Sequence, residues 1–265
     1  MLEETDINAY FCLLYLLLYM AKLTEEELLF RKIEEKVKKA IFDYSLIQDG
    51  DRILVGLSGG KDSLALVDLL GRRSKIFRPK FGVVVTHIVM STIPYHSDLD
   101  YLKSCADEHG LPFIVHETGF DASTDTRKSP CFLCSWTRRK ALFDIAKANG
   151  CNKIALGHHQ DDILQTLLMN MIHQGAFGTM PPKLKMDKFD MEIIRPLCLV
   201  EEKELIRIAE WKGYRKQIKN CPYESGSSRS EMKDVLARLE AINPEARYSI
   251  WASMTNIQQD YLPHK

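Results

Sequence analysis

The chain has 265 residues, with 36 basic and 36 acidic side chains, 45% apolar residues and 9% aromatic residues. This ordinary globular composition excludes a disordered chain and a fibrous repeat, and the length predicts one large domain or one domain with appendages. Because the formal net charge is zero, a polyanionic partner would have to bind a local basic patch instead of responding to the field of the whole molecule.

Near the N-terminus, residues 11–19 (FCLLYLLLY) are strongly apolar. The run is much shorter than the roughly 20 residues that span a bilayer, and acidic residues precede it, unlike the basic start of a signal peptide. We therefore predict a cytoplasmic protein with no membrane partner. Two interpretations of this segment remain open. Either Met20 is the biological start and residues 1–19 come from an upstream start codon, or the segment is a buried or partner-binding helix.

From Thr24 onward, the spacing of apolar residues predicts a helix, with Thr24 and Glu27 as a capping box. Short apolar runs then alternate with helical patterns. Such alternation indicates parallel βαβ units, and hence the α/β class with a doubly wound, mostly parallel sheet. The expected strands are 52–57, 81–89, 112–116, 153–156 and 193–197, and the expected helices are 64–70, 98–109, 135–149 and 161–173.

Two stretches break the alternation, and we predict both to be loops: residues 118–130, and residues 175–190, which are rich in Gly, Pro and Lys. Beyond them the pattern is helical. We predict an N-terminal helical region, a central α/β domain and a C-terminal helical appendage. The regions are 1–48, 49–200 and 201–265, and the last contains expected helices at 201–213, 230–242 and 244–257.

A glycine loop follows the first expected strand and precedes a helix. Gly59 and Gly60 allow backbone N–H groups to approach an anion, and the helix N-terminus adds a partial positive charge. The loop is not a Walker A loop, because Gly56 lies too close to Gly60 and Asp62 follows the lysine, and the sequence does not match a Gly-x-Gly-x-x-Gly loop either. The alternative is a plain strand-to-helix turn capped by serine. The residues expected to bind phosphate are Ser58, Gly59, Gly60, Lys61, Asp62 and Ser63.

The run 58–63 (SGGKDS) resembles the SGGxDS signature of the PP-loop ATP pyrophosphatases. This superfamily adenylates a carbonyl oxygen and releases pyrophosphate. The resemblance therefore implies that the loop holds the phosphates of ATP, and that residues 49–200 form a PP-loop domain with an adenine nucleotide alpha-hydrolase-like fold.

Cys131 and Cys134 form a Cys-x-x-Cys pair at the start of an expected helix, near basic residues that would lower a thiol pKa. Two thiolates can hold a soft metal, but structural zinc would require four ligands. Only Cys221 stands out as a further ligand. Three cysteines suit an iron–sulfur cluster with one iron not bound by the protein better than a closed zinc site. We interpret the remaining thiols as core or incidental: Cys12, Cys105, Cys151 and Cys198.

Residues 157–162 (GHHQDD) lie between an expected strand and a helix, where ligands bind in open α/β sheets. Asp161 and Asp162 offer the oxygen ligands that Mg²⁺ on ATP prefers. The alternative is that these acidic residues only favour the first turn of a helix. The further residues predicted to bind ATP are His87, Gly157 and His158.

A second resemblance rests on residues 130–175, on 180–184 (MPPKL) and on 195–197 (RPL). These stretches are similar to the tRNA 2-thiocytidine biosynthesis proteins, over roughly residues 22–257. In that family ATP activates cytidine 32 of the tRNA anticodon loop, and C2 is thiolated through a [4Fe-4S] cluster. One departure is Glu224, which stands where family members have a second distal cysteine. The resemblance implies three cluster ligands: Cys131, Cys134 and Cys221.

The implied reaction begins when the C2 oxygen of the base attacks the α-phosphorus of ATP. Positive charge then stabilises the transferring group, and Lys61 and Arg138 are the candidates. Mg²⁺ is expected near Asp62 and Asp161. The predicted catalytic residues are therefore the two cationic candidates, Lys61 and Arg138, together with Asp161. The implied partners are tRNA, a cysteine desulfurase or another sulfur donor, and a second copy of the chain in a homodimer.

Two basic stretches could contact RNA. Residues 203–219 carry six basic and two acidic residues, and residues 127–140 carry five basic residues and none that is acidic. The first stretch could equally be a solvated helix face. Trp136 could stack on a flipped base or pack in the core.

Three other functions are compatible with parts of this pattern. A 2-thiouridine synthetase would be expected to carry extra terminal cysteine pairs, which are absent. A lysidine synthetase shares the glycine loop but does not need the cysteines. A nucleotide-binding regulator with structural zinc would neither thiolate nor modify RNA.

Overall fold

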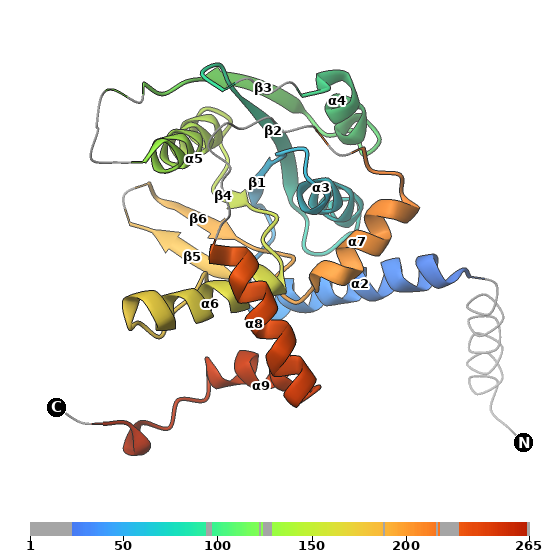
Figure 1. The fold of residues 1–265 in the computed structure, drawn as a ribbon. Coiled ribbons are helices and arrows are strands. Elements are labelled where there is room, and N and C mark those ends of the chain that lie inside the picture. The colour runs from blue at the N-terminus through green and yellow to red at the C-terminus, as the bar shows by residue number, and fades with distance from the viewer. Residues whose placement is uncertain are drawn as a thin grey trace, which may run out of the picture.

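The described strands form one six-stranded sheet in the order β3-β2-β1-β4-β6-β5 (Figure 1). The computed structural model describes residues 23–93, 97–121, 123, 129–187, 189–215, 217 and 228–263. The strands are β1 (Arg52–Gly56), β2 (Gly82–Met90), β3 (Phe113–Thr118), β4 (Lys153–Ala155), β5 (Lys183–Met186) and β6 (Met191–Ile194). The helices are α2 (Glu25–Asp43), α3 (Lys61–Arg73), α4 (Leu99–Asp107), α5 (Pro130–Ala148), α6 (Gln160–Gln174), α7 (Glu202–Trp211), α8 (Ser228–Ile242) and α9 (Ala246–Ser253), with a 3₁₀ turn at Gln259–Tyr261.

The sheet is parallel except at one edge. β1 pairs in parallel with β2 and β4, and the parallel pairing continues to β3 and β6. The expected doubly wound, mostly parallel α/β fold is therefore confirmed.

The prediction of a loop throughout residues 175–190 is wrong at 183–186, which form β5 and pair antiparallel with β6. Leu184 lies opposite Ile193, and Met186 packs against the core beneath the sheet. β5 is a four-residue edge strand in which Lys183 and Lys185 alternate with Leu184 and Met186, and lysines on an edge strand disfavour further pairing. The strand pattern of four residues is too short to be recognised within a stretch rich in Gly, Pro and Lys.

Two apolar cores lie on opposite faces of the sheet. On one face, Ile53 and Val85 pack with α2, α3, α4 and α7 in a single large cluster. On the other, Leu54 and Val84 pack beneath Phe143 of α5. Alternate residues of β1 and β2 thus enter different cores, as the two-residue period of a strand requires. Helices cover both faces, as expected for a parallel sheet (Figure 1).

Local capping signals set the helix boundaries. The Thr24 hydroxyl accepts a bond from the Glu27 backbone N–H at 3.2 Å, and the Glu27 carboxylate accepts from the Thr24 N–H at 2.8 Å, which confirms the capping box. α5 begins at Pro130, so the cysteine pair opens this helix as expected, although the apolar pattern alone indicated 135–149. Ser129 caps the helix, and proline is favoured in the first helical turn. At the other end of the chain, α9 stops at Ser253, short of the expected 257.

The C-terminal helices α8 and α9 lie next to α6 (Figure 1). α8 packs on α6, and α9 packs on both α6 and α8. Among the helices of the described residues, none has the length and apolar character needed to cross a membrane. The three-part division of the chain at residues 48 and 200 stays a prediction, and residues 11–19 lie outside the described part.

Candidate functional site

The candidate site lies at the carboxyl ends of β1 and β4, where the strand order reverses. From β1 the sheet continues through β2 and β3 on one side and through β4 and β6 on the other. A crevice at such a reversal is where open α/β sheets bind ligands. The glycine loop follows β1, and residues 156–159 follow β4, so the two predicted motifs meet at this point.

The glycine loop has the conformation of an anion site. Gly59 has φ +78°, in the region that favours glycine, and Gly60 is the N-cap of α3 without a side-chain cap bond among the described residues. The Ser58 N–H donates to Ser63 Oγ at 3.1 Å, and that hydroxyl donates to the Gly60 carbonyl at 2.9 Å. The serines therefore brace the loop, while the first N–H groups of α3 can bind an anion.

Two close contacts fix the loop from outside. A Cβ on Gly59 would lie 2.4 Å from Gln217 Cγ, because Gln217 packs directly on the loop. Gln217 is buried, and its Oε1 accepts the Asp98 N–H at 2.7 Å. On the β4 side, a Cβ on Gly157 would lie 3.1 Å from the Asp62 carbonyl carbon. Gly157 therefore brings residues 157–160 against the start of α3.

Lys61 has carboxylate partners within the site. Its Nζ lies 3.1 Å from Asp62 Oδ1 and 3.3 Å from Glu202 Oε1, at the start of α7. The Lys61 and Asp62 side chains are 29% and 28% exposed, so both can still meet a ligand. The structure thus brings Lys61 and Asp62 together, as the sequence predicted, and adds Glu202.

The two histidines after β4 have different neighbours. His159 caps α6, because its Nδ1 accepts the Asp162 N–H at 3.4 Å and the Asp162 carboxylate accepts the His159 N–H at 3.1 Å. His158 Nδ1 lies 3.3 Å from Nε of the buried Arg195, the arginine of the Arg-Pro-Leu motif. Arg195 thereby orients His158, which was predicted to bind ATP.

Asp161, predicted to be catalytic and to bind Mg²⁺, is buried with both carboxylate oxygens engaged. Its Oδ2 accepts the Glu202 backbone N–H at 2.7 Å, and its Oδ1 lies 2.9 Å from a guanidinium nitrogen of Arg247 on α9. Arg247 is also buried, and its Nε donates to Glu240 at 2.8 Å. Burial lowers the pKa of Arg247, but the Glu240 and Asp161 carboxylates raise it, and the net shift is upward. Asp161 therefore joins α6, α7 and α9.

His87, also predicted to bind ATP, is 1% exposed. Its Nδ1 lies 2.6 Å from the Leu57 carbonyl, which fixes Nδ1 as the donor, and its Nε2 lies 2.7 Å from Ser97 Oγ. Burial lowers the pKa of His87, the bond to Leu57 opposes this, and the charge of Arg138 adds to the lowering. The neutral imidazole therefore links β2 to the strand that precedes the glycine loop.

Arg138 lies on α5, close enough to His87 for its charge to help lower the pKa of that ring. Its Nε is buried and has no hydrogen-bond partner in the part of the chain that the structure describes. A buried donor without an acceptor is costly, and an anionic ligand would satisfy it. The predicted role of Arg138 at a transferring phosphate fits this geometry.

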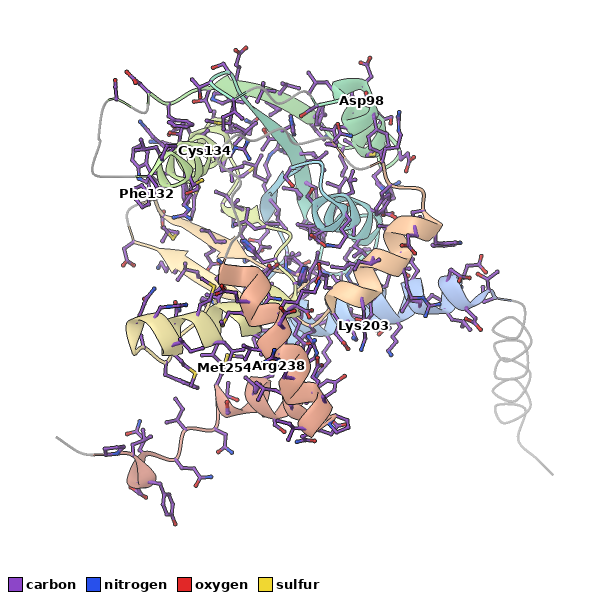
Figure 2. The ribbon with its side chains drawn as sticks, viewed as in Figure 1. Asp98, Phe132, Cys134, Lys203, Arg238 and Met254 are labelled. Carbon is purple, nitrogen blue, oxygen red and sulfur yellow. The ribbon has the colours of Figure 1, made fainter. Side chains whose placement is uncertain are left out.

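The cysteine pair lies at the N-terminal end of α5. Cys131 is exposed, and Cys134 is half-buried against Met90 and Ile93 near the end of β2 (Figure 2). Among the described residues no group of three metal ligands is found, but Cys221 and Glu224 lie outside them, so the three-cysteine set stays a prediction.

The other described cysteines are core thiols, as predicted. Cys151 and Cys198 are buried, and Cys105 packs against the main core. Burial raises the pKa of Cys198 to about 12, so this thiol stays protonated and inert.

The two basic stretches differ. Each described basic residue of 203–219 has a carboxylate partner: Lys203 with Glu201, Arg207 with Glu25 and Glu26, Lys212 with Asp68, and Arg215 with Asp98. This pairing favours a structural role for that stretch.

On α5, by contrast, Trp136 is 53% exposed, so core packing of its ring is excluded. Lys140 Nζ lies 5.8 Å from the Trp136 ring centroid, and Phe132, one turn earlier, is 47% exposed (Figure 2). Exposed aromatic and basic groups therefore lie together beside Cys131.

Sequence reasoning missed Glu202, Gln217 and Arg247. Glu201 and Glu204 form a capping box whose spacing could have marked the start of α7 and drawn attention to Glu202. No local signal marks Gln217 or Arg247, because the residues they contact at the site, Gly59 and Asp161, are distant in the sequence.

Comparisons with known proteins agree with this geometry. A PP-loop domain model matches residues 29–220. The chain is 34% identical over 243 residues to the tRNA-cytidine(32) 2-sulfurtransferase of Geobacter metallireducens, covering 89% of this chain and 94% of that protein. It is 36% identical over 241 residues to the protein of the same name from Nitrosospira multiformis, covering 88% and 80%.

Among solved structures, the chain is similar to the U34-tRNA thiolase NcsA from Methanococcus maripaludis with its [4Fe-4S] cluster. The TM-score is 0.71 and the identity 26%, over 90% of this chain and 81% of that one.

Proposed function

Since the chain belongs to the PP-loop domain family and to the family of tRNA-cytidine(32) 2-sulfurtransferases, we propose that its site uses ATP to adenylate cytidine 32 of tRNA and then replaces the C2 oxygen by sulfur. The observation that carries the proposal is the meeting of the glycine loop, the N-terminus of α3 and Gly157 at one edge of the sheet. Arg138 adds a guanidinium nitrogen that has no hydrogen-bond partner among the described residues. The tRNA substrate implies that the enzyme acts in the cytoplasm.

ATP would bind with its phosphates on the glycine loop. The N–H groups at the start of α3 and Lys61 would hold the leaving pyrophosphate, while Arg138 would approach the α-phosphate from α5. The C2 oxygen of the base attacks the α-phosphorus and the bond to pyrophosphate breaks. Sulfur at the oxidation level of sulfide would then attack C2, and AMP would leave with the original oxygen and the electron pair of the C2–O bond. Lys61 and Arg138 would stabilise the negative charge that develops on the pyrophosphate and on the α-phosphate during this step.

Mg²⁺ on the nucleotide fits Asp62 better than Asp161. Asp62 lies in the first turn of α3 and is partly exposed. Asp161 would have to give up Arg247 or the Glu202 N–H to bind a metal ion. We therefore keep Asp62 as the metal ligand and assign Asp161 a supporting role at the start of α6.

The proposed cluster ligands are Cys131, Cys134 and Cys221. The two described thiols suit the group, because they are one helical turn apart at a helix N-terminus and one is exposed. Gln217, four residues before Cys221, packs on Gly59, so the chain leaves the described part beside the nucleotide loop. These three cysteines would hold a [4Fe-4S] cluster and leave one iron able to bind the sulfur that is to be transferred. A cysteine desulfurase or another donor would provide the sulfur.

The exposed face of α5 is the proposed contact for the anticodon loop. Aromatic rings stack on unpaired bases, and cationic side chains meet phosphates. Trp136 and Phe132 provide the rings, and Arg139 and Lys140 the charge, with no acidic residue between 129 and 143. A homodimer remains part of the proposal from the family resemblance.

Nucleoside mass spectrometry of total tRNA tests the function. Cells lacking the gene should lose 2-thiocytidine, and the wild-type gene should restore it. Loss of another thionucleoside would support ATP-dependent thiolation but show that a different base is modified. No loss at all would contradict the proposal.

A Cys131→Ala gene tests the role of the cysteine pair in the same cells. Because Cys131 is exposed, its removal should leave the thermal midpoint within about 2 °C of the wild type while 2-thiocytidine stays absent. A Ser135→Ala gene, changed one turn away, is the matched control and should restore the nucleoside. Thiolation by the Cys131→Ala enzyme would refute a ligand role.

A further inference from the structure

Glu202 forms a bridge between the glycine loop and the C-terminal helices. Its Oε1 lies 3.3 Å from Lys61 Nζ, and its Oε2 lies 2.9 Å from Lys233 Nζ on α8. One carboxylate thus holds two ammonium groups from segments far apart in the sequence. Burial raises the pKa of Glu202, but the two lysines lower it, and the net shift is downward. The bridge is therefore ionic at neutral pH.

The bridge is partly shielded from solvent. The Glu202 and Lys61 side chains are 23% and 29% exposed, whereas Lys233 is 60% exposed. Lys61 is the more confined of the two ammonium groups, and it stands at the first position of α3, directly after Gly60. Glu202 is confined too, because its backbone N–H donates to Asp161 and fixes the start of α7.

This geometry has a consequence for a polyphosphate ligand. Lys61 already lies between two carboxylates, those of Asp62 and Glu202, and both would repel an incoming phosphate. Lys61 has three N–H donors, so it can turn one toward a phosphate without leaving Glu202 entirely. When Lys61 turns partly toward a phosphate, the Glu202 carboxylate still has its contact with Lys233. The charge of Glu202 is then balanced from α8.

We propose that Glu202 is a positioning residue for the reaction at the glycine loop, because it holds Lys61 there, and that Lys233 of α8 neutralises the Glu202 charge so that the nucleotide can bind. This inference rests on the proposed function, because it concerns the same loop. It adds that α8 contributes to nucleotide affinity although no residue of α8 need touch the nucleotide. By reciprocity, a nucleotide on the loop should strengthen the attachment of α8.

The test is a double-mutant cycle read by calorimetric titration of the full-length enzyme with α,β-methylene ATP and Mg²⁺, since this analogue cannot release pyrophosphate. Lys233→Ala leaves Glu202 without its second partner, so the dissociation constant should rise about three- to fivefold, the range of a partly exposed ion pair. Lys233→Arg should restore affinity. Arg238→Ala removes a positive charge from an exposed position of the same helix and should change affinity less than twofold (Figure 2).

Glu202→Gln completes the cycle. It removes the repulsive charge but keeps the N–H that binds Asp161, so the analogue should bind at least as tightly as to the wild type. Because Lys61 loses its anchor, kcat for tRNA-dependent AMP formation should fall, and a general loss of folding would not give this split.

In the Glu202→Gln background, Lys233→Ala should have no further effect. The inference is wrong if Lys233→Ala weakens binding equally in both backgrounds, or if Arg238→Ala matches it. If the wild-type enzyme does not bind the analogue, the proposed function itself fails.

Discussion

Gly59→Ala should destabilise the protein by about 2–4 kcal/mol. Two terms contribute. The φ of +78° costs an L residue about 1–2 kcal/mol. The new methyl would also lie 2.4 Å from Gln217 Cγ and 3.2 Å from its Cβ, so the side chain cannot escape by rotating only its far end. Gln217 would have to leave, breaking its 2.7 Å bond from the Asp98 N–H and its 3.3 Å bond to the Arg215 carbonyl, at about 1–2 kcal/mol.

Urea unfolding measures this difference, and Gln217→Ala separates the two terms. In the Gln217→Ala background the 2.4 Å contact with Cγ is gone and only the milder 3.2 Å contact with Cβ remains, so Gly59→Ala should cost mainly the backbone part, about 1–2 kcal/mol. Gly60→Ala is the matched control, because the nearest atom to its new Cβ would be Ser58 Oγ at 3.5 Å, an ordinary contact. A Gly59→Ala cost below about 0.5 kcal/mol, or one that Gln217→Ala leaves unchanged, would refute this reasoning.

Three further predictions concern other parts of the site. Arg247→Met leaves the buried Asp161 carboxylate without its charged partner and should cost about 3 kcal/mol in urea unfolding; a cost below 1 kcal/mol would contradict it. His87 has a lowered pKa in the folded state, so its contribution to stability is complete above the ordinary histidine pKa and is lost as the pH falls below about 6.5. The fall in unfolding free energy between pH 7 and 5 should therefore be smaller in His87→Gln, and an equal slope would count against the buried neutral ring. Trp136→Ala should weaken binding of an anticodon stem-loop RNA by about 1–3 kcal/mol in filter binding, while Trp136→Phe retains most of it; equal losses would argue against stacking.

Local patterns were enough to predict the frame of the fold and the nucleotide loop. Alternating strand and helix signals gave a parallel sheet, and the run from Ser58 to Ser63 carries the loop's chemistry in adjacent residues. The sheet then brings Gly157 to the same edge, because β4 lies next to β1. Each of these features depends on a strand end or a turn, which short stretches of sequence encode.

The contacts that complete the site could not be predicted in this way. The ion pairs Arg247–Asp161 and Lys233–Glu202 form only when the C-terminal helices pack on α6. Such pairings depend on the placement of whole helices and not on spacing within one. β5 was missed for a different reason, since a four-residue edge strand bonds only on one side and has little pattern to detect.

The packing of Gln217 on Gly59 bears on how the protein is made. The ribosome delivers the chain from its N-terminus at about 5–20 residues per second, so the glutamine is synthesised on the order of ten seconds or more after the glycine it covers. The first strand and helix can form during that interval, but the loop between them lacks its final neighbour. Slowing of translation between these two residues would therefore prolong the time in which the nascent loop is open to water, proteases and chaperones.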